Sequence, residues 1–216
     1  MSYLYFEYFD VLFLAFMVTF VLVVTKFIMA SSSSEPPQTG QKAPLSMKLV
    51  MAGIRKKYPS VKHVSTTDLH SKMGKIQPTE NSPNLMLLDV RYVDEFEVSC
   101  LSNAVWIDEK LPTKEKLCEV EEKLLEKQNT DVYVYCSVGY RSSDLISQIT
   151  KSPSYEKFSK QNINFYNITG GIFQWANEKR QVFNKDGNKA DLVHPYNAFF
   201  GKLLNKSYRF KPKKPL

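Results

Sequence analysis

Apolar residues along the chain predict strands that alternate with helices. The run Asn84–Asp89 is apolar almost to its end, and Asp131–Tyr135 alternates valine with tyrosine, so both are typical of strands covered on each face of a sheet. Ile163–Ile168 reads as the last strand, whereas Leu145–Thr150 and residues 114–127 carry apolar residues at helical spacing. This pattern indicates an α/β fold with a central, mainly parallel sheet.

Shorter elements complete the pattern. Met47–Lys57 predicts a helix with one apolar side, and Val61–Val64 predicts a short strand. Ser65 is placed to cap a helix that runs to about Met73. A short helical insertion is predicted at 153–158, and a helix at Ile172–Lys179.

Residues 11–30, VLFLAFMVTFVLVVTKFIMA, form a separate apolar segment whose only charge is Lys26. The segment is long enough to span a bilayer as a helix, and Lys26 lies near enough to its end to reach the interface. Glu7 and Asp10 precede it, unlike the basic start of a cleaved signal peptide. A single-pass membrane anchor is therefore the favoured prediction; a cleaved signal and a buried or interfacial helix are the alternatives. Lysines and arginines follow the span, which predicts that the remaining chain faces the cytosol.

Composition divides the rest of the chain. Residues 31–46 are rich in Ser, Pro and Gln and predict a flexible linker, residues 47–182 form the folded domain, and residues 183–216 form a basic tail. Most of the net charge of +7 lies in that tail. It is expected to wrap on the domain as a solvated segment; binding of anionic lipid beside the anchor is the alternative, and nucleic acid is not expected as a partner. Within it, residues 196–204 predict a short amphipathic helix.

The three cysteines and three histidines are scattered, without the spacing of a disulfide framework or a zinc site. A reducing compartment is favoured, which agrees with the predicted cytosolic location. No metal is expected, and no cofactor. The chain also lacks the glycine-rich motifs that cradle nucleotide phosphates.

The candidate catalytic residues lie where the predicted strand Asp131–Tyr135 ends and the next helix begins. Ligands of open α/β sheets usually bind at such carboxyl ends. A loop in this position can direct its N–H groups at an anion, here the Cys136 thiolate. Ser142, Ser143 and Asp144 are expected to cap the following helix. The candidate site residues are the catalytic Cys136 and the substrate-binding Ser137, Val138, Gly139, Tyr140, Arg141 and Ser142.

The loop from Cys136 to Ser142 resembles the active-site loop of the rhodanese family. Leu87–Arg91 followed by Asp94–Phe96 resembles the family's first strand and turn, and Gly170–Trp175 resembles its closing motif. The resemblance implies a three-layer domain and a thiosulfate sulfurtransferase. In that chemistry the cysteine takes the outer sulfur of an anionic donor such as thiosulfate, and the persulfide passes it to a thiol or to cyanide. Arg141 is expected to bind the anionic donor, because its planar guanidinium matches paired oxygens.

Two other functions compete with sulfur transfer. One is a membrane-tethered rhodanese-like module that binds or regulates a partner without turnover, although the intact loop argues against it. The other is a phosphatase or arsenate reductase, which four residues between Cys136 and Arg141 disfavour, since related phosphatases have five. Tyr135 also stands where those enzymes carry histidine.

Several residues around the motifs have two possible roles. Asp89 and Arg91 are expected to form an ion pair that shapes a turn, rather than to contact substrate. Cys100–Ala104 stands where the family usually has His-Ile-Pro-Gly-Ala, which predicts a changed turn in an unchanged fold. Cys100 is expected to be a small buried side chain, with a resolving thiol as the alternative. Cys118 and Trp175 are expected to be packing residues.

Overall fold

A computed structural model of the chain describes residues 43–74 and 84–211. The predicted membrane span at 11–30 and nearly all of the predicted linker lie outside these residues. Within the described ranges, no helix combines the length and apolar character that crossing a bilayer requires. The elements in chain order are α2 (Leu45–Lys57), β1 (His63–Val64), α3 (Thr66–Gly74), β2 (Asn84–Asp89), α4 (Val93–Val98), β3 (Val105–Trp106), α5 (Thr113–Leu124), β4 (Thr130–Tyr135), α6 (Tyr140–Lys151), α7 (Tyr155–Lys160), β5 (Ile163–Ile168), α8 (Gly171–Asn177), β6 (Val182–Phe183), β7 (Lys189–Ala190) and the 3₁₀ helices η1 (Phe200–Leu203) and η2 (Lys206–Tyr208).

The strands form a five-stranded parallel sheet in the order β1-β5-β4-β2-β3, which confirms the predicted α/β fold with a central parallel sheet. β4 lies in the middle, and every residue of it is buried. β2 pairs with it along its whole length and brings Asp89 opposite Tyr135. The carboxyl ends of the two central strands therefore lie side by side.

The strand and helix predictions agree closely with the observed elements. The strands at Asn84–Asp89 and Ile163–Ile168 have the predicted bounds. Ser65 caps α3, since its Oγ accepts the Asp68 N–H at 3.0 Å. In α2, Met47 and Ile54 are buried. The apolar stripe of that helix thus packs against the domain, as its spacing indicated.

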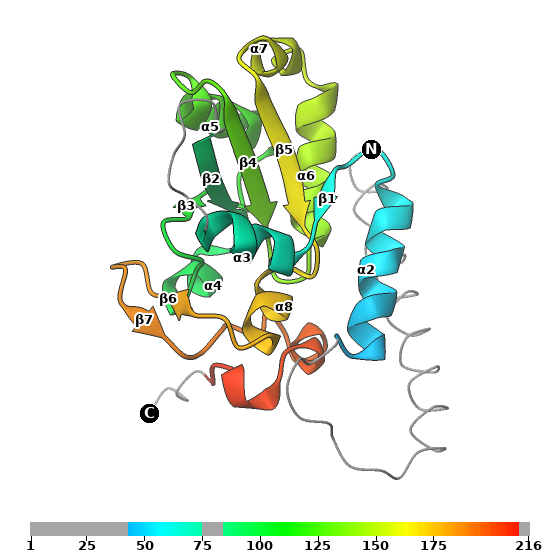
Figure 1. The fold of residues 1–216 in the computed structure, drawn as a ribbon, viewed down its shortest axis with the longest axis vertical. Coiled ribbons are helices and arrows are strands. Elements are labelled where there is room, and N and C mark those ends of the chain that lie inside the picture. The colour runs from blue at the N-terminus through cyan, green and yellow to red at the C-terminus, as the bar shows by residue number, and fades with distance from the viewer. Residues whose placement is uncertain (1–42, 75–83, 212–216) are drawn as a thin grey trace.

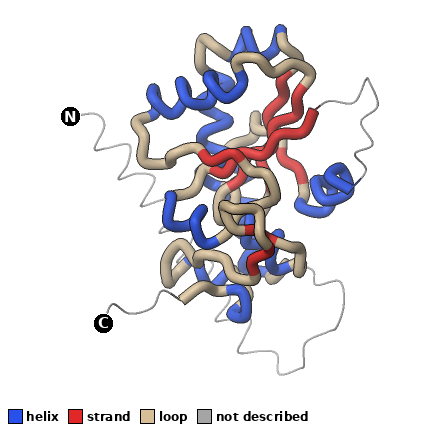
Figure 2. Tube along the Cα trace, turned by 90° about the vertical axis from the view of Figure 1, so that its left-hand side faces the viewer, coloured by secondary structure: helices blue, strands red, loops and turns tan. Residues whose placement is uncertain are grey.

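The arrowheads of β4 and β5 point toward α4, α8 and the orange-to-red C-terminal segment (Figure 1). Figure 2, turned by 90°, shows that much of this end of the molecule consists of loop. Loops at the carboxyl ends of parallel strands are where α/β folds build ligand sites. The functional site is therefore expected at this end.

The described part of the predicted tail packs against the domain. β6 and β7 form a small antiparallel hairpin, and Val193 and Leu204 are buried to 0% and 1% exposure. The amphipathic helix predicted at 196–204 is wrong in extent, because only Phe200–Leu203 is helical, as one 3₁₀ turn. This segment continues the apolar core beyond α8.

Candidate active site

Cys136 follows directly on β4, at the centre of the carboxyl edge of the sheet. Its side chain is 1% exposed. Among the described residues, one N–H group hydrogen bonds its sulfur: that of Gly139 donates to Sγ at 3.2 Å. The end of the central strand thus places a shielded sulfur beside the start of the next helix.

The loop turns into α6 at Gly139, which has a φ of +100°. Side chains rarely adopt this backbone conformation, so glycine suits the position. Because the turn is tight, α6 begins at Tyr140, and the predicted cap at Ser142, Ser143 and Asp144 is wrong. Ser143 instead donates to the Gly139 carbonyl at 2.7 Å from within the first turn of the helix. The loop between the sulfur and the helix is therefore only three residues long.

The start of α8 fixes the other side of this loop. The N–H groups of Ile172 and Phe173 donate to the carbonyls of Cys136 and Ser137 at 3.0 and 3.1 Å. A Cβ on Gly171 would lie 2.1 Å from the Cys136 oxygen, so only glycine permits this approach. Gly171, the second glycine of the closing motif, thus lets the start of α8 lie against the loop.

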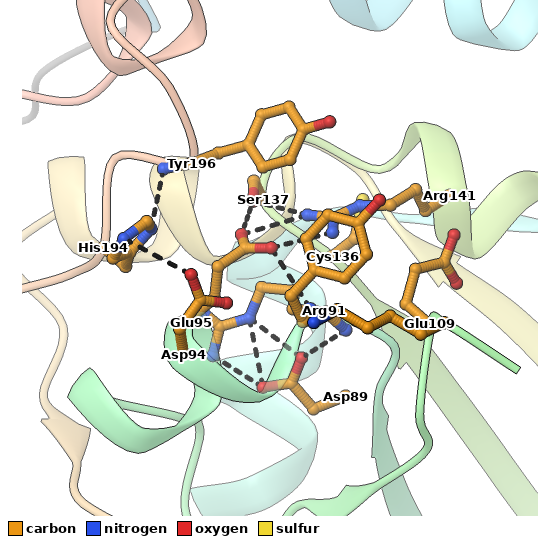
Figure 3. A network of polar contacts seen from close by, with 12 residues as sticks. Asp89, Arg91, Asp94, Glu95, Glu109, Cys136, Ser137, Arg141, His194 and Tyr196 are labelled. Carbon is orange, nitrogen blue, oxygen red and sulfur yellow. Dashed lines mark hydrogen bonds and ion pairs between the residues drawn. The ribbon is translucent and has the colours of Figure 1, made fainter.

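Arg141, Glu95 and Ser137 form a closed hydrogen-bonded ring beside the sulfur (Figure 3). Arg141 donates to both carboxylate oxygens of Glu95, at 2.7 and 3.0 Å. Its Nη2 also donates to Ser137 Oγ at 2.9 Å, and that hydroxyl donates to Glu95 Oε1 at 2.6 Å. Glu95 itself is fully buried. The charge of Arg141 is therefore paired within the protein.

Both members of this pair are charged in the folded state. Burial alone would raise the pKa of Glu95, but the hydrogen bonds and charge of Arg141, helped by Arg91 and Ser137, lower it below its ordinary value. Burial alone would lower the pKa of Arg141, but the charges of Cys136 and Glu95 raise it above its ordinary value. The site thus holds a guanidinium whose field reaches the sulfur and whose donors face a carboxylate.

Two tyrosines cover the guanidinium. Its carbon lies 4.7 Å from the centre of the Tyr196 ring and 5.1 Å from that of Tyr92, which precedes α4. The two rings stack with centres 6.1 Å apart. Aromatic faces attract a cation and exclude water from it. Tyr196 comes from the C-terminal segment, and Figure 3 shows its ring above Ser137 and Arg141.

Asp89 and Arg91 form a buried ion pair below the ring. The Arg91 Nε and Nη2 donate to the two Asp89 oxygens at 2.8 and 2.6 Å, and neither side chain is exposed. Arg91 also donates to the Ser99 carbonyl, and its own carbonyl accepts from Trp106 Nε1 at 2.8 Å. These contacts confirm the prediction of an ion pair that shapes the turn.

The other two cysteines differ in exposure. Cys100 is buried at 5% exposure, as expected for a packing residue, and burial, with the charge of Asp89, raises its pKa to about 11. Cys118 is exposed, so its prediction as a packing residue is wrong. Val120 and Leu124 carry the buried face of α5. Leu117 also packs against the core. The buried face of the helix therefore follows residues 117, 120 and 124, and Cys118 lies outside it.

No group of three or more His, Cys, Asp or Glu within residues 43–74 and 84–211 is arranged to hold a metal ion.

Comparison with known proteins agrees with this geometry. A model of the rhodanese-like domain matches residues 66–178, which is more than half of the chain. The chain belongs to the rhodanese-like family. A search of curated protein sequences found no match.

Solved structures with a similar fold were also found. A Bacillus halodurans protein is 18% identical over 70% of this chain and 96% of its own, with a TM-score of 0.43. A thiosulfate sulfurtransferase from Pseudomonas aeruginosa is 12% identical, with a TM-score of 0.47; the match covers 73% of this chain but only 26% of that protein. A yeast protein tyrosine phosphatase of the rhodanese family is 19% identical over 54% of this chain and 85% of its own, with a TM-score of 0.44.

The rhodanese-like domain keeps the family's turn after α4 in altered form. In Cys100–Ala104, the family's glycine is replaced by Asn103, which has a φ of +57°. Asparagine tolerates this left-handed conformation better than other non-glycine residues. The Ala104 N–H donates to the Leu101 carbonyl, and Tyr135 accepts the Leu101 N–H at 2.9 Å. The loss of Pro and Gly therefore leaves the turn closed.

Sequence reasoning did not assign a role to four residues that build the site. Glu95 lies in the quoted Asp-Glu-Phe motif, which could have marked it as the partner of Arg141. Asn167 on β5 accepts a hydrogen bond from Ser142 Oγ at 2.6 Å and so supports the loop. Tyr92, just before α4, carried no signal of its own. Tyr196 carried none either, because only the folded chain brings the C-terminal segment to the loop.

Proposed function

We propose that this rhodanese-like protein is a sulfurtransferase of the thiosulfate type, which carries a sulfane sulfur on Cys136. The observation that supports it most is the sulfur of Cys136 at the end of the central strand, hydrogen bonded by the Gly139 N–H and shielded from solvent. The N-terminus of α6 and the guanidinium of Arg141 place positive charge beside this sulfur. A binding or regulatory module without turnover is the competing function.

The reaction has two displacements at sulfur. The Cys136 thiolate attacks the outer sulfur of the donor, a new S–S bond forms, and the old bond breaks with its electron pair on the leaving group, which is sulfite when thiosulfate is the donor. A nucleophilic acceptor, a thiol or cyanide, then attacks the outer sulfur of the persulfide and restores the Cys136 thiolate. Each step conserves atoms and electrons and needs no oxidant.

The loop would bind the transferred group through its backbone. We expect this group to contact Ser137, Val138, Gly139, Tyr140, Arg141 and Ser142, which form the loop after Cys136 and the first turn of α6. Arg141 contributes its charge and holds Ser137 and Glu95 in position. The low exposure of the sulfur would protect a persulfide from water and from stray thiols.

Intact-mass measurement after treatment with thiosulfate tests the proposal. We expect the wild-type protein to gain one sulfur atom and to lose it on addition of cyanide or thiol, whereas Cys136→Ser gains none. Arg141→Ala should still gain the sulfur, but it should need a higher thiosulfate concentration to do so, because donor binding is weaker. The absence of any sulfur gain in the wild type, with every donor tried, would favour the module without turnover.

The location of this activity is also a proposal. We expect residues 11–30 to anchor the protein in a membrane as a single span, with the domain facing the cytosol. The protein should remain in the membrane fraction after alkaline carbonate extraction. Glycosylation at the Asn205 sequon, which is exposed, would show the opposite orientation; the Asn167 sequon reports nothing, because Asn167 is buried in the folded domain.

A further inference from the structure

A line of polar side chains runs from β1 to the start of α6, beside the active-site loop. β1 pairs with β5, and the register of the pair sets His63 opposite Asn167. The Asn167 amide nitrogen lies 3.1 Å from His63 Nδ1, and the amide oxygen accepts a hydrogen bond from Ser142 Oγ at 2.6 Å. Asn167 is 1% exposed and Ser142 is fully buried, so solvent does not reach this amide to replace either partner.

The same amide lies close to the turn that hydrogen bonds the sulfur. A Cβ on Gly139 would lie 3.1 Å from the Asn167 amide nitrogen and 3.2 Å from the Ile168 carbonyl. The Gly139 N–H is the group that donates to Cys136 Sγ at 3.2 Å. Asn167 therefore supports this turn on one side and holds Ser142, in the first turn of α6, on the other.

The hydrogen bond to His63 requires one state of the imidazole. Ser142 uses the amide oxygen, so the amide nitrogen faces Nδ1 and donates to it, and Nδ1 must carry no proton. In a protonated imidazole both ring nitrogens are donors, so two N–H groups would oppose each other. The amide then pairs with His63 only by turning over. This rotation presents its NH₂ group to the Ser142 hydroxyl and removes the oxygen to which that hydroxyl donates.

The surroundings of His63 keep it neutral at neutral pH. Burial lowers its pKa, the Tyr58 carbonyl raises it and the charge of Arg55 lowers it, so that the pKa lies below its ordinary value. Among the described residues no carboxylate contributes to this pKa, and the Lys62 ammonium donates to a side chain of β5 instead. His63 therefore becomes charged only when the pH falls through the lowered pKa, and the charge then faces the N–H₂ group of Asn167.

We propose that Asn167 is a positioning residue for sulfur transfer, and that neutral His63 fixes its amide in the orientation that supports the active-site loop. The inference rests on the proposed reaction at Cys136. With His63 neutral, the amide holds the first turn of α6 and keeps the Gly139 N–H directed at the sulfur. When His63 is protonated, the amide turns over, Ser142 loses its acceptor, and sulfur loading slows.

Matched pH profiles of sulfur loading test this pairing. The full chain in detergent is mixed with thiosulfate between about pH 8 and about pH 5, and the second-order rate constant for the gain of one sulfur is measured by rapid quench and intact mass. His63→Asn keeps an acceptor oxygen near the place of Nδ1 but does not titrate. Titration of the Cys136 thiol is common to both proteins and cancels in the ratio of their rates. The ratio of His63→Asn to wild type should rise about three- to tenfold as the pH falls, the range for one lost hydrogen bond.

Variants at Asn167 show whether the histidine acts through the amide. Asn167→Ala should slow loading by about tenfold at about pH 8, and adding His63→Asn to it should no longer alter the pH profile. Two matched controls should keep the wild-type profile: Asn164→Ala, on the same strand but hydrogen bonded at the surface, and His70→Asn, at an exposed histidine. Urea denaturation at about pH 5 checks that each variant is folded before its rates are compared.

A second measurement does not depend on activity. In NMR spectra of the isotope-labelled chain, the side-chain amide signals of Asn167 should shift as His63 titrates in the wild type and stay constant in His63→Asn. The inference is overturned by a rate ratio that does not change with pH, by amide signals that do not respond to His63, or by an undiminished effect of His63→Asn in the Asn167→Ala background. Wild-type protein that takes up no sulfur at any pH would instead contradict the proposed function, and the amide signals would still test the pairing.

Discussion

Glu95 shows how one residue changes the chemistry of a recognised motif. The loop sequence pairs a cysteine with an arginine and suggests an open anion site. In the structure the fully buried carboxylate of Glu95 accepts hydrogen bonds from Nη1 and Nη2 of this arginine. The same residue accepts from Ser137 and from the Tyr92 N–H, at 2.6 and 3.2 Å. It thereby ties α4 to the loop and contributes to stability.

The paired state of Glu95 predicts a pH dependence of folding. Its pKa in the folded protein lies below the ordinary value of about 4.3, so the stability it contributes is present above that value and is lost as the pH falls through the folded pKa. We expect urea denaturation of Glu95→Gln between about pH 5 and 3 to show a slope shallower by up to about 1.4 kcal/mol per pH unit. Glu97→Gln, at an exposed position, should keep the wild-type slope.

The cysteines should differ in reactivity. The raised pKa of Cys100, about 11, and its burial leave almost no thiolate at pH 8, whereas Cys118 is exposed. Timed alkylation with peptide mapping should label Cys118 much faster, by roughly a hundredfold or more, than Cys100. Unfolding in urea should abolish the difference. A disulfide between Cys100 and Cys136 after oxidation would revive the resolving-thiol hypothesis.

At the scale of elements, the N-terminal ends of two helices, α6 and α8, contact the active loop. α6 begins directly after Gly139, and α8 donates two N–H groups to the loop carbonyls. Both starts use a glycine at positive φ, one as the N-cap of α6 and one as the first residue of α8. The geometry of the sulfur therefore depends on how closely α8 can approach β4.

Gly171 provides the test of this approach. In Gly171→Ala the new Cβ would clash with the Cys136 carbonyl, in addition to the cost of about 1–2 kcal/mol for a side chain in left-handed backbone. We expect a larger loss of unfolding free energy and nearly complete loss of sulfur transfer. Gly187→Ala also has a positive φ but no atom within 4 Å, so it should show only the backbone cost and keep activity. Equal effects of the two variants would refute the close-approach argument.

At the scale of the whole molecule, the domain includes a segment that lies beyond the family match at 66–178. Val193 and Leu204 are buried in the same core as the sheet, and Tyr196 covers Arg141. The C-terminal segment is thus both a part of the fold and a wall of the site.

This packing predicts unequal effects within one segment. Leu204→Ala removes a side chain that is 1% exposed and should lower the free energy of unfolding by about 2–5 kcal/mol in urea denaturation. Leu192→Ala, at a residue 40% exposed, should change it by less than about 0.5 kcal/mol. Similar values for the two variants would show that the segment does not share the core.

The sequence by itself determined which segments form strands, the position of Cys136 at the carboxyl end of a buried strand, and the family motifs, because apolar periodicity and short motifs are local properties. Strands such as Asn84–Asp89 were predictable because burial on both faces demands a continuous apolar run. Only the tertiary structure decided that Arg141 is paired with Glu95, that Tyr196 covers it, and that Cys118 faces solvent. These three features depend on which segments distant in sequence come into contact in the fold. Local sequence patterns do not predict such contacts.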